Sequence, residues 1–227
     1  IENFICSMKK VLAIAGVLAL TVRPTASFSH HLLPKESEFR PGGNLEHIKL
    51  RGNLSYGIDL SGANLNGARV VSNLSNANLS RASLYGADLK YINLNNANLV
   101  ETNLSRAFLN GANLSSSNLR GANLWGAYMA GINLAGADLS GANLNRVDLS
   151  GITRLPGSNG VRINAEDLVW SNLTGANLSN ASLSFANLQG VDLSNTILSG
   201  IDATNLKSCP RFLPTGWLCE NNSLIQR

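Results

Sequence analysis

The sequence predicts an all-β solenoid, a coil with four sides per turn whose successive turns stack in parallel. Leucine, or Met129 in one case, returns every fifth residue in sixteen consecutive pentads from Leu74 to Leu149. A small or β-branched residue stands two positions before each of them, and Asn or Asp stands one position before in thirteen of the sixteen. A repeat this regular indicates one structural unit stacked many times.

The period of five excludes a single helix or strand. A helix needs apolar residues every 3.6 positions and a half-exposed strand needs them at every second position. A chain that turns a corner every five residues points the leucine (position i) and the small residue (i−2) inward, and i−1, i+1 and i+2 outward. Four sides then close a square of about twenty residues, and coils stack at the strand spacing of about 4.8 Å. Leu114 should lie between Leu94 and Leu134, with the small residues at the corners.

The residues that fill the repeat follow a pattern of their own. Segments such as GANLSG, GADLSG and GANLNG follow the pattern A-[N/D]-L-x-x. This pattern closely resembles that of the pentapeptide repeat family over roughly residues 58–205. The resemblance implies a right-handed quadrilateral parallel β-helix, and it leaves the function open because most members of the family have no known biochemical role.

The first element, residues 1–29, has the composition of a secretory signal peptide. Residues 8–10 (Met-Lys-Lys) are basic, Val11–Val22 is apolar, and small residues follow, which is the order of such a signal. Twelve apolar residues are too few to span a bilayer, so we expect no membrane span after cleavage; an uncleaved anchor is the alternative. Residues 1–7 are expected to lie upstream of the natural start. The signal predicts export to a periplasm, the extracellular space or a thylakoid lumen.

The repeat has two runs with a break between them. Residues 30–57 are expected to form an irregular segment and a ragged first coil, and clean pentads follow over 58–151. Residues 152–167 contain the turn-forming run PGSNG, and Glu166 would otherwise point inward, where an unpaired carboxylate is too costly. We therefore expect a register-breaking loop here and a second run of pentads over 168–206.

The tail, residues 207–227, contains no pentad and predicts a capping hairpin. Trp217–Glu220 and Ser223–Gln226 flank two asparagines, which tolerate the positive φ of a two-residue turn. The ends of a solenoid expose open strand edges unless a cap covers them. End-to-end self-association is the other way in which such edges are satisfied.

The cysteine count depends on the start of the chain. Without residues 1–7 two cysteines remain, Cys209 and Cys219. An even count in an exported chain favours a disulfide between them, and two free thiols in the tail are the alternative.

Few residues suit catalysis or metal binding. No histidine falls within the solenoid, no Ser-His-Asp arrangement is apparent, and phosphate-binding glycine loops are absent from the sequence. His30 and His31 could form a metal-binding pair, but no Cys, Asp or Glu cluster joins them. The sequence therefore predicts no catalytic residue, cofactor or metal, and a non-enzymatic scaffold or interaction module. A cell-envelope enzyme with a site in the 152–167 loop and a purely structural spacer are the alternatives.

Charge argues against a nucleic-acid role. Between Ile58 and Ala203 eight Lys and Arg residues stand against nine Asp and Glu residues. Some pentapeptide repeat proteins imitate DNA and protect topoisomerases, which needs a densely negative surface, so this balance makes mimicry of DNA improbable. The sequence also has no basic stripe of the kind that binds nucleic acid.

Aromatic residues at outward positions predict an interaction patch. The twenty-residue period places Tyr85 and Trp125 on one side, two coils apart, and makes Phe108 and Tyr128 direct neighbours one coil apart, with Tyr91 at the margin. A contiguous apolar patch with a polar rim marks an interaction surface, so we expect an unknown protein partner here. The alternative is that these rings lie flat over the corners as ordinary packing.

Overall fold

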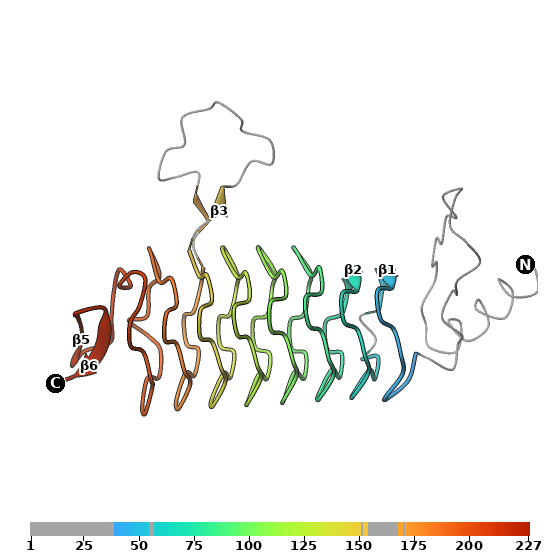
Figure 1. Ribbon diagram of the computed structural model, residues 1–227, viewed down its shortest axis with the longest axis horizontal. Helices are drawn as coiled ribbons and strands as arrows, with labels where there is room; N and C mark the ends of the chain where they lie inside the picture. The colour runs from blue at the N-terminus through green and yellow to red at the C-terminus, as the bar shows by residue number, and fades with distance from the viewer. Residues whose placement is uncertain (1–38, 55–56, 151, 154–167, 170) are drawn as a thin grey trace, which may run out of the picture.

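The computed structural model describes residues 39–54, 57–150, 152–153, 168–169 and 171–227. These residues build an elongated coil with four sides per turn, closed at its C-terminal end by a hairpin (Figure 1). No helix occurs in the described part of the chain, and so none there is long and apolar enough to cross a membrane. The strands are β1 (Lys49–Asn53), β2 (Arg69–Asn73), β3 (Ile152–Thr153), β4 (Leu168–Val169), β5 (Trp217–Glu220) and β6 (Ser223–Gln226). The expected signal peptide, residues 1–29, lies outside the described residues.

Most sides of the coil are held by single parallel bridges instead of long strands. One column of bridges joins Asn93, Asn113 and Asn133, which are twenty residues apart. The amide of Leu94 donates to the Asn113 carbonyl at 2.7 Å, and the amide of Leu114 donates to the Asn133 carbonyl at 2.7 Å. Leu114 is fully buried, so its predicted place between the coils of Leu94 and Leu134 is confirmed.

Most corners are tight β-turns that begin at the leucine. At one corner the amide of Ala77 donates to the Leu74 carbonyl at 3.1 Å, and Asn76 has a φ of 61°. A positive φ at the third residue of the turn is the mark of a type II turn, which favours Gly or Asn there. We expected the small residue at i−2 to occupy the corner. The sharp bend lies instead at i+1 and i+2, and the small residue ends the turn with its side chain in the core.

Asparagines at i−1 link neighbouring coils and also brace the turns. The Asn98 amide nitrogen donates to Asn78 Oδ1 at 3.1 Å, and the same oxygen accepts the Ser80 backbone amide at 3.2 Å. Aspartates take the same position, and the Ser194 hydroxyl and amide hold the pKa of Asp192 below its ordinary value of 3.8. These short polar side chains therefore bond to the adjacent backbone, as Asn and Asp do in turns.

The break in the repeat is an insertion at one corner. Bridged residues are 20 apart in the coils that directly precede it, as in Tyr128 and Asp148, and 39 apart across it, as in Asp148 and Asn187. β3 and β4 pair antiparallel and project from the side of the coil (Figure 1). We expected the second run of pentads to start at residue 168. Leu168 lies in β4 opposite Thr153, and the ladder resumes at Asn172. Most of the expected 152–167 loop lies outside the described residues.

The C-terminal cap is the expected hairpin. β5 and β6 pair antiparallel around Asn221 and Asn222, whose φ values of 47° and 56° suit a two-residue turn. The amide of Leu206 donates to the Asn222 carbonyl at 2.7 Å, and the amide of Leu224 donates to the Ala203 carbonyl at 2.9 Å. The hairpin therefore satisfies backbone groups of the last coil that would otherwise form an open edge.

The disulfide lies within this cap. Cys209 and Cys219 are bonded, with a sequence separation of 10 and Cα atoms 6.0 Å apart. The ladder itself runs further than we expected, because Ser208 bridges Asn187 and Phe212 bridges Asp192. Part of the segment that we assigned to the cap, residues 207–212, thus still belongs to the coil.

Candidate interaction surface

An exposed aromatic pair interrupts the polar ladder on one side of the coil. Bridges join Asp88, Phe108, Tyr128 and Asp148 in one column. The Phe108 and Tyr128 rings stack with centroids 5.0 Å apart and planes within 6°. This distance follows from the coil spacing of about 4.8 Å. The exposed fractions are 36% for Phe108 and 49% for Tyr128, so the stacked pair is open to a partner, and Asp88 and Asp148 bracket it in the column.

The neighbouring corner carries a second row of aromatic residues, alternating with arginines. We call this row the corner strip; it consists of Tyr85, Arg106, Trp125, Arg146 and Phe185. The Arg106 guanidinium carbon lies 5.1 Å from the centroid of the Trp125 ring, and that of Arg146 lies 5.0 Å from the Phe185 ring. Both contacts have the distance of a cation–π interaction.

Tyr85 stands apart from the other rings of the strip. It occupies the same corner position as Trp125, two coils earlier, and the coil of Ser105 lies between them. The side chain of Tyr85 is 45% exposed, and that of Trp125 is half-buried. The structure thus places both residues where the twenty-residue period predicts, along one corner and without mutual contact in the described part of the chain.

Phe185 is the member of the strip that sequence analysis missed. Its coil position follows from the 39-residue step, because the amide of Arg146 donates to the carbonyl of Ser184 at 2.9 Å. If the period of twenty residues ran unbroken through the chain, Phe185 would lie beside residues other than Arg146. Excising nineteen residues at the break would have aligned Phe185 with Arg146.

The remaining predicted residue, Tyr91, lies at the far margin of the stacked pair. Its side chain is 69% exposed and its backbone has a φ of 58°. Lys90, beside it, places its Nζ atom 4.9 Å from the Phe108 centroid and 3.8 Å from an Asp88 oxygen. Arg69 contacts the same carboxylate at 3.6 Å. Tyr91 therefore joins the patch through Lys90 and not through ring contact.

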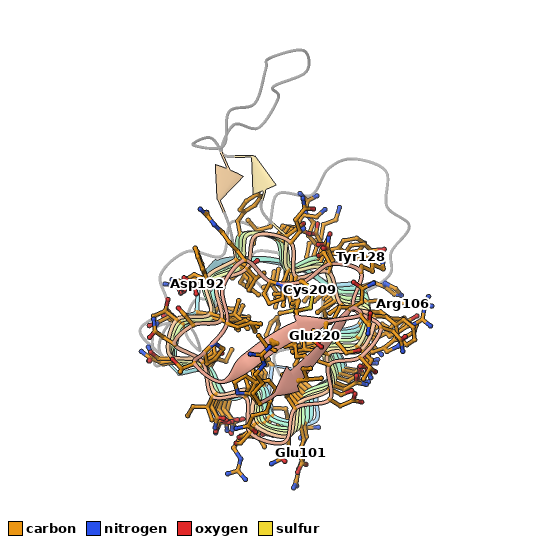
Figure 2. The ribbon with its side chains drawn as sticks, turned by 90° about the vertical axis from the view of Figure 1, so that its left-hand side faces the viewer. Glu101, Arg106, Tyr128, Asp192, Cys209 and Glu220 are labelled. Atoms are coloured by element: carbon orange, nitrogen blue, oxygen red, sulfur yellow. A yellow bond between two sulfur atoms is a disulfide. The ribbon has the colours of Figure 1, made fainter. Side chains whose placement is uncertain are left out.

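Figure 2 views the molecule along the coil axis and labels one residue of the corner strip, Arg106, and one of the stacked pair, Tyr128. Arg106 and Tyr128 lie next to each other on one flank, Asp192 lies on the opposite flank, and Glu101 lies at a third position. Cys209 and Glu220 mark the capped end. The stacked pair and the corner strip are therefore one continuous face along the coil.

The other described parts of the molecule offer few groups that could bind a metal or catalyse a reaction. No group of three or more His, Cys, Asp or Glu residues that could hold a metal occurs in the described ranges. A hollow of about 640 Å³ lies along another side, lined by polar and small residues that include Ser80, Arg81 and Asn118. Its lining contains no carboxylate and no histidine. The pair His30 and His31 lies outside the described residues.

The repeat matches that of a known family. Eight copies of the motif described as pentapeptide repeats match residues 72–99, 117–153 and 167–200, and the four-sided coil has the geometry that this repeat produces. The coil of this chain is thus built of repeats that match the pentapeptide repeat motif. No curated protein matches this pentapeptide repeat protein.

Several solved pentapeptide repeat structures are similar to this pentapeptide repeat protein. One is a protein of the Arabidopsis thaliana thylakoid lumen, with 25% identity over 60% of this chain and 68% of that one and a TM-score of 0.37. Another is Rfr23 of the cyanobacterium Cyanothece 51142, with 28% identity over 76% and 88% and a TM-score of 0.27. A third is QnrB1, a plasmid-mediated fluoroquinolone resistance protein, with 21% identity over 71% and 83% and a TM-score of 0.41.

Proposed function

We propose that this pentapeptide repeat protein is an exported, non-enzymatic module that binds another protein through the face formed by the stacked pair and the corner strip. The observation that carries the proposal is the row of exposed rings at positions that elsewhere hold Asn, Ser or Gly. Aromatic side chains supply much of the binding energy at protein interfaces. A rigid coil holds them at a fixed spacing, which lowers the entropy lost on binding.

The backbone under the corner strip holds large side chains at the turn position that favours glycine. Arg106, Arg146 and Phe185 have φ values of 58°, 63° and 63°. Bulky residues rarely adopt this conformation, which costs about 1–2 kcal/mol relative to glycine. Glycine occupies the equivalent turn position in neighbouring coils, as at Gly86 and Gly126. Large side chains are thus displayed here at a cost in stability, as they also are at Arg81, Tyr91 and Glu101 outside the strip.

Export is part of the proposal and rests on two features. Residues 1–29 have the composition of a signal peptide, and Cys209 and Cys219 form a disulfide. Disulfides persist mainly in oxidising compartments such as a periplasm or an organelle lumen. We therefore place the protein in such a compartment.

The test is a double variant, Trp125→Ser with Tyr128→Ser, compared with the wild-type protein by photo-crosslinking in an extract of the native compartment. The crosslinker is placed at Tyr85, on the same face. The control is Ile197→Ser, which removes a large side chain that is 55% exposed and bridges Asn177 on another side of the coil. We expect the double variant to lose the crosslinked partner band and to keep its melting temperature, while the control keeps both.

Two results would contradict the proposal. A large drop in the melting temperature of the double variant would identify the rings as ordinary packing. An undiminished partner band would show that binding takes place elsewhere, and the structural spacer would then be the better description.

A further inference from the structure

We propose that the partner presents an extended acidic segment, with carboxylates that bind Arg106 and Arg146 and apolar side chains that cover the stacked pair. This inference rests on the proposed function and specifies the chemistry of the partner. It starts from the charge of the two arginines of the corner strip. The proposed function rests on the aromatic rings and does not use this charge.

Both arginines are held in place with their hydrogen-bonding edges free. Each is exposed, and each guanidinium carbon lies over an aromatic ring, 5.1 Å from its centroid for Arg106 and 5.0 Å for Arg146. Neither forms an ion pair with any described residue. Stacking restricts the planar guanidinium while its N–H groups remain available for a bidentate contact with a carboxylate.

Charge is divided between this face and the rest of the coil. The face carries four basic side chains and two carboxylates, namely Arg69, Lys90, Arg106, Arg146, Asp88 and Asp148. The other described coil residues between 58 and 203 carry two basic and five acidic side chains, namely Arg81, Arg120, Asp59, Glu101, Asp138, Asp192 and Asp202. Of these, Asp202 borders the Phe185 end of the strip, where it accepts a hydrogen bond from Ser184 at 3.3 Å. The face is thus the positive flank of an otherwise acidic coil, and it suits an acidic partner.

The spacing of the arginines selects an extended partner chain. Arg106 and Arg146 occupy the same corner position two coils apart, which is about 9.6 Å along the axis. A chain in the extended polyproline II conformation advances about 3.1 Å per residue with three residues per turn, so carboxylates three residues apart lie on one face of it and would meet the two guanidiniums. The side chains between them would reach Phe108 and Tyr128 on the adjacent side.

The carboxylates on this face argue against a nucleic acid. Arg69 and Lys90 already contact Asp88 at 3.6 Å and 3.8 Å, and Asp148 lies beyond Tyr128 in the same column. A nucleic acid carries a phosphate at every nucleotide and needs a basic track along its whole length. A protein segment can place its carboxylates only opposite the arginines and avoid the two aspartates.

The experiment measures binding of labelled peptides of about twelve residues by fluorescence anisotropy. The peptides carry Glu, Gln or Lys at every third position, with Val and Ser between. We expect the Glu peptide to bind at least about tenfold more tightly than the Gln and Lys peptides, and to weaken as salt rises from about 10 mM to about 150 mM.

The variant for this test is Arg106→Gly with Arg146→Gly, which removes both guanidiniums and relieves the positive φ. Its matched control is Ser116→Gly, which changes a turn residue with a φ of 57° at another corner. We expect the double variant to keep its melting temperature and to bind the Glu and Gln peptides equally, while the control keeps the wild-type preference. Equal binding of the two peptides by the wild-type protein, or tighter binding of a single-stranded DNA of similar length, would overturn the proposal.

Crosslinking to the native partner distinguishes a failure of this inference from a failure of the proposed function. If the crosslinked band survives in the arginine variant and is lost in the Trp125→Ser, Tyr128→Ser variant, the acidic-segment inference is wrong and the proposed function stands. If both variants keep the band, both are wrong. If both lose it while their melting temperatures hold, the two proposals stand together.

Discussion

At the scale of single residues, the alternation of inward and outward positions decides which substitutions each position of a pentad tolerates. The leucines and the small residues two positions earlier are almost completely buried, as Leu104 and Ala107 are at 0% exposure. The positions after each leucine form the turn and face solvent, where polar and glycine residues suffice. Burial is therefore set by position in the repeat, and two adjacent residues have very different sensitivities.

Leu114→Asp and Ser115→Asp test this alternation. The first places an unpaired carboxylate in the core, and we expect it to lower the free energy of unfolding by more than about 4 kcal/mol. The second lies at a part-buried turn position, beside the Asn95 amide group, and should change stability by less than about 1 kcal/mol. Urea unfolding followed by circular dichroism measures both. Equal destabilisation would contradict the inward assignment of every fifth residue.

Gly141→Ala tests the corner conformation at a site without steric conflict. Gly141 has a φ of 67°, and an added Cβ would meet no atom within 4 Å. The backbone alone should therefore cost about 1–2 kcal/mol of stability. Ser140→Ala, one residue earlier in the same turn, is the control and should be almost neutral. A neutral Gly141→Ala in the same thermal unfolding measurement would argue against the type II turn.

At the scale of elements, the strands mark the places where the pentad repeat changes. β2 replaces a tight turn, and Val70 and Leu74 are four residues apart there instead of five. With one residue fewer, the chain runs through the corner in extended form, and β2 pairs with β1 over five residues. β5 and β6 form the cap, in which Leu224 is buried and Trp217 packs against the core. The regular coil needs no long strands because each side is only a few residues long.

The disulfide of the cap is the covalent feature that can be tested directly. We expect the exported protein to be two hydrogen masses lighter than its reduced form by mass spectrometry. Cys209→Ser with Cys219→Ser should lower the free energy of unfolding by about 2–3 kcal/mol, because the closed loop is short. Loss of the tether should also expose the edge of the last coil and promote aggregation. Free, readily alkylated thiols in the folded protein would refute the disulfide and weaken the argument for export.

At the scale of the whole molecule, the coil is continuous across the insertion. The bridges from Asp138 to Asn177 and from Asn143 to Ser182 show that the turns before and after it stack directly. β3 and β4 leave the coil at a corner and return to the same corner. The insertion is thus an addition to a complete solenoid and not a structural part of it.

Deleting residues 152–170 tests this continuity. The deletion removes nineteen residues and joins Gly151 to Ser171, which restores the sequence DLSGSNL with leucines five residues apart. We expect the shortened protein to fold with a free energy of unfolding within about 1 kcal/mol of the wild type or above it, because a long loop is replaced by a regular turn. Crosslinking to the partner should also persist. Lost binding with intact folding would support the alternative that the function lies in the 152–167 loop.

Most of the architecture could be predicted from local pattern. The period of five, the inward leucines, the Asn-Asn turn and the pairing of Trp217–Glu220 with Ser223–Gln226 all depend on contacts within one repeat or one hairpin. The same period brought Phe108 and Tyr128 together, because a constant step of twenty residues fixes their separation. Each of these features follows from spacing alone, which a sequence displays directly.

Only the tertiary structure decided where the period is interrupted and what then lies side by side. Leu168 lies five residues before Leu173 and follows an aspartate, as a pentad leucine does, yet it pairs with Thr153 outside the coil. Phe185 reaches Arg146 only because coils 39 residues apart stack on each other. The sequence by itself determined the repeating unit, since burial of leucine and turn formation are local. The proposed binding face depends on which distant coils stack on each other. They stack directly across the insertion because the core and the hydrogen-bonded ladder then stay unbroken.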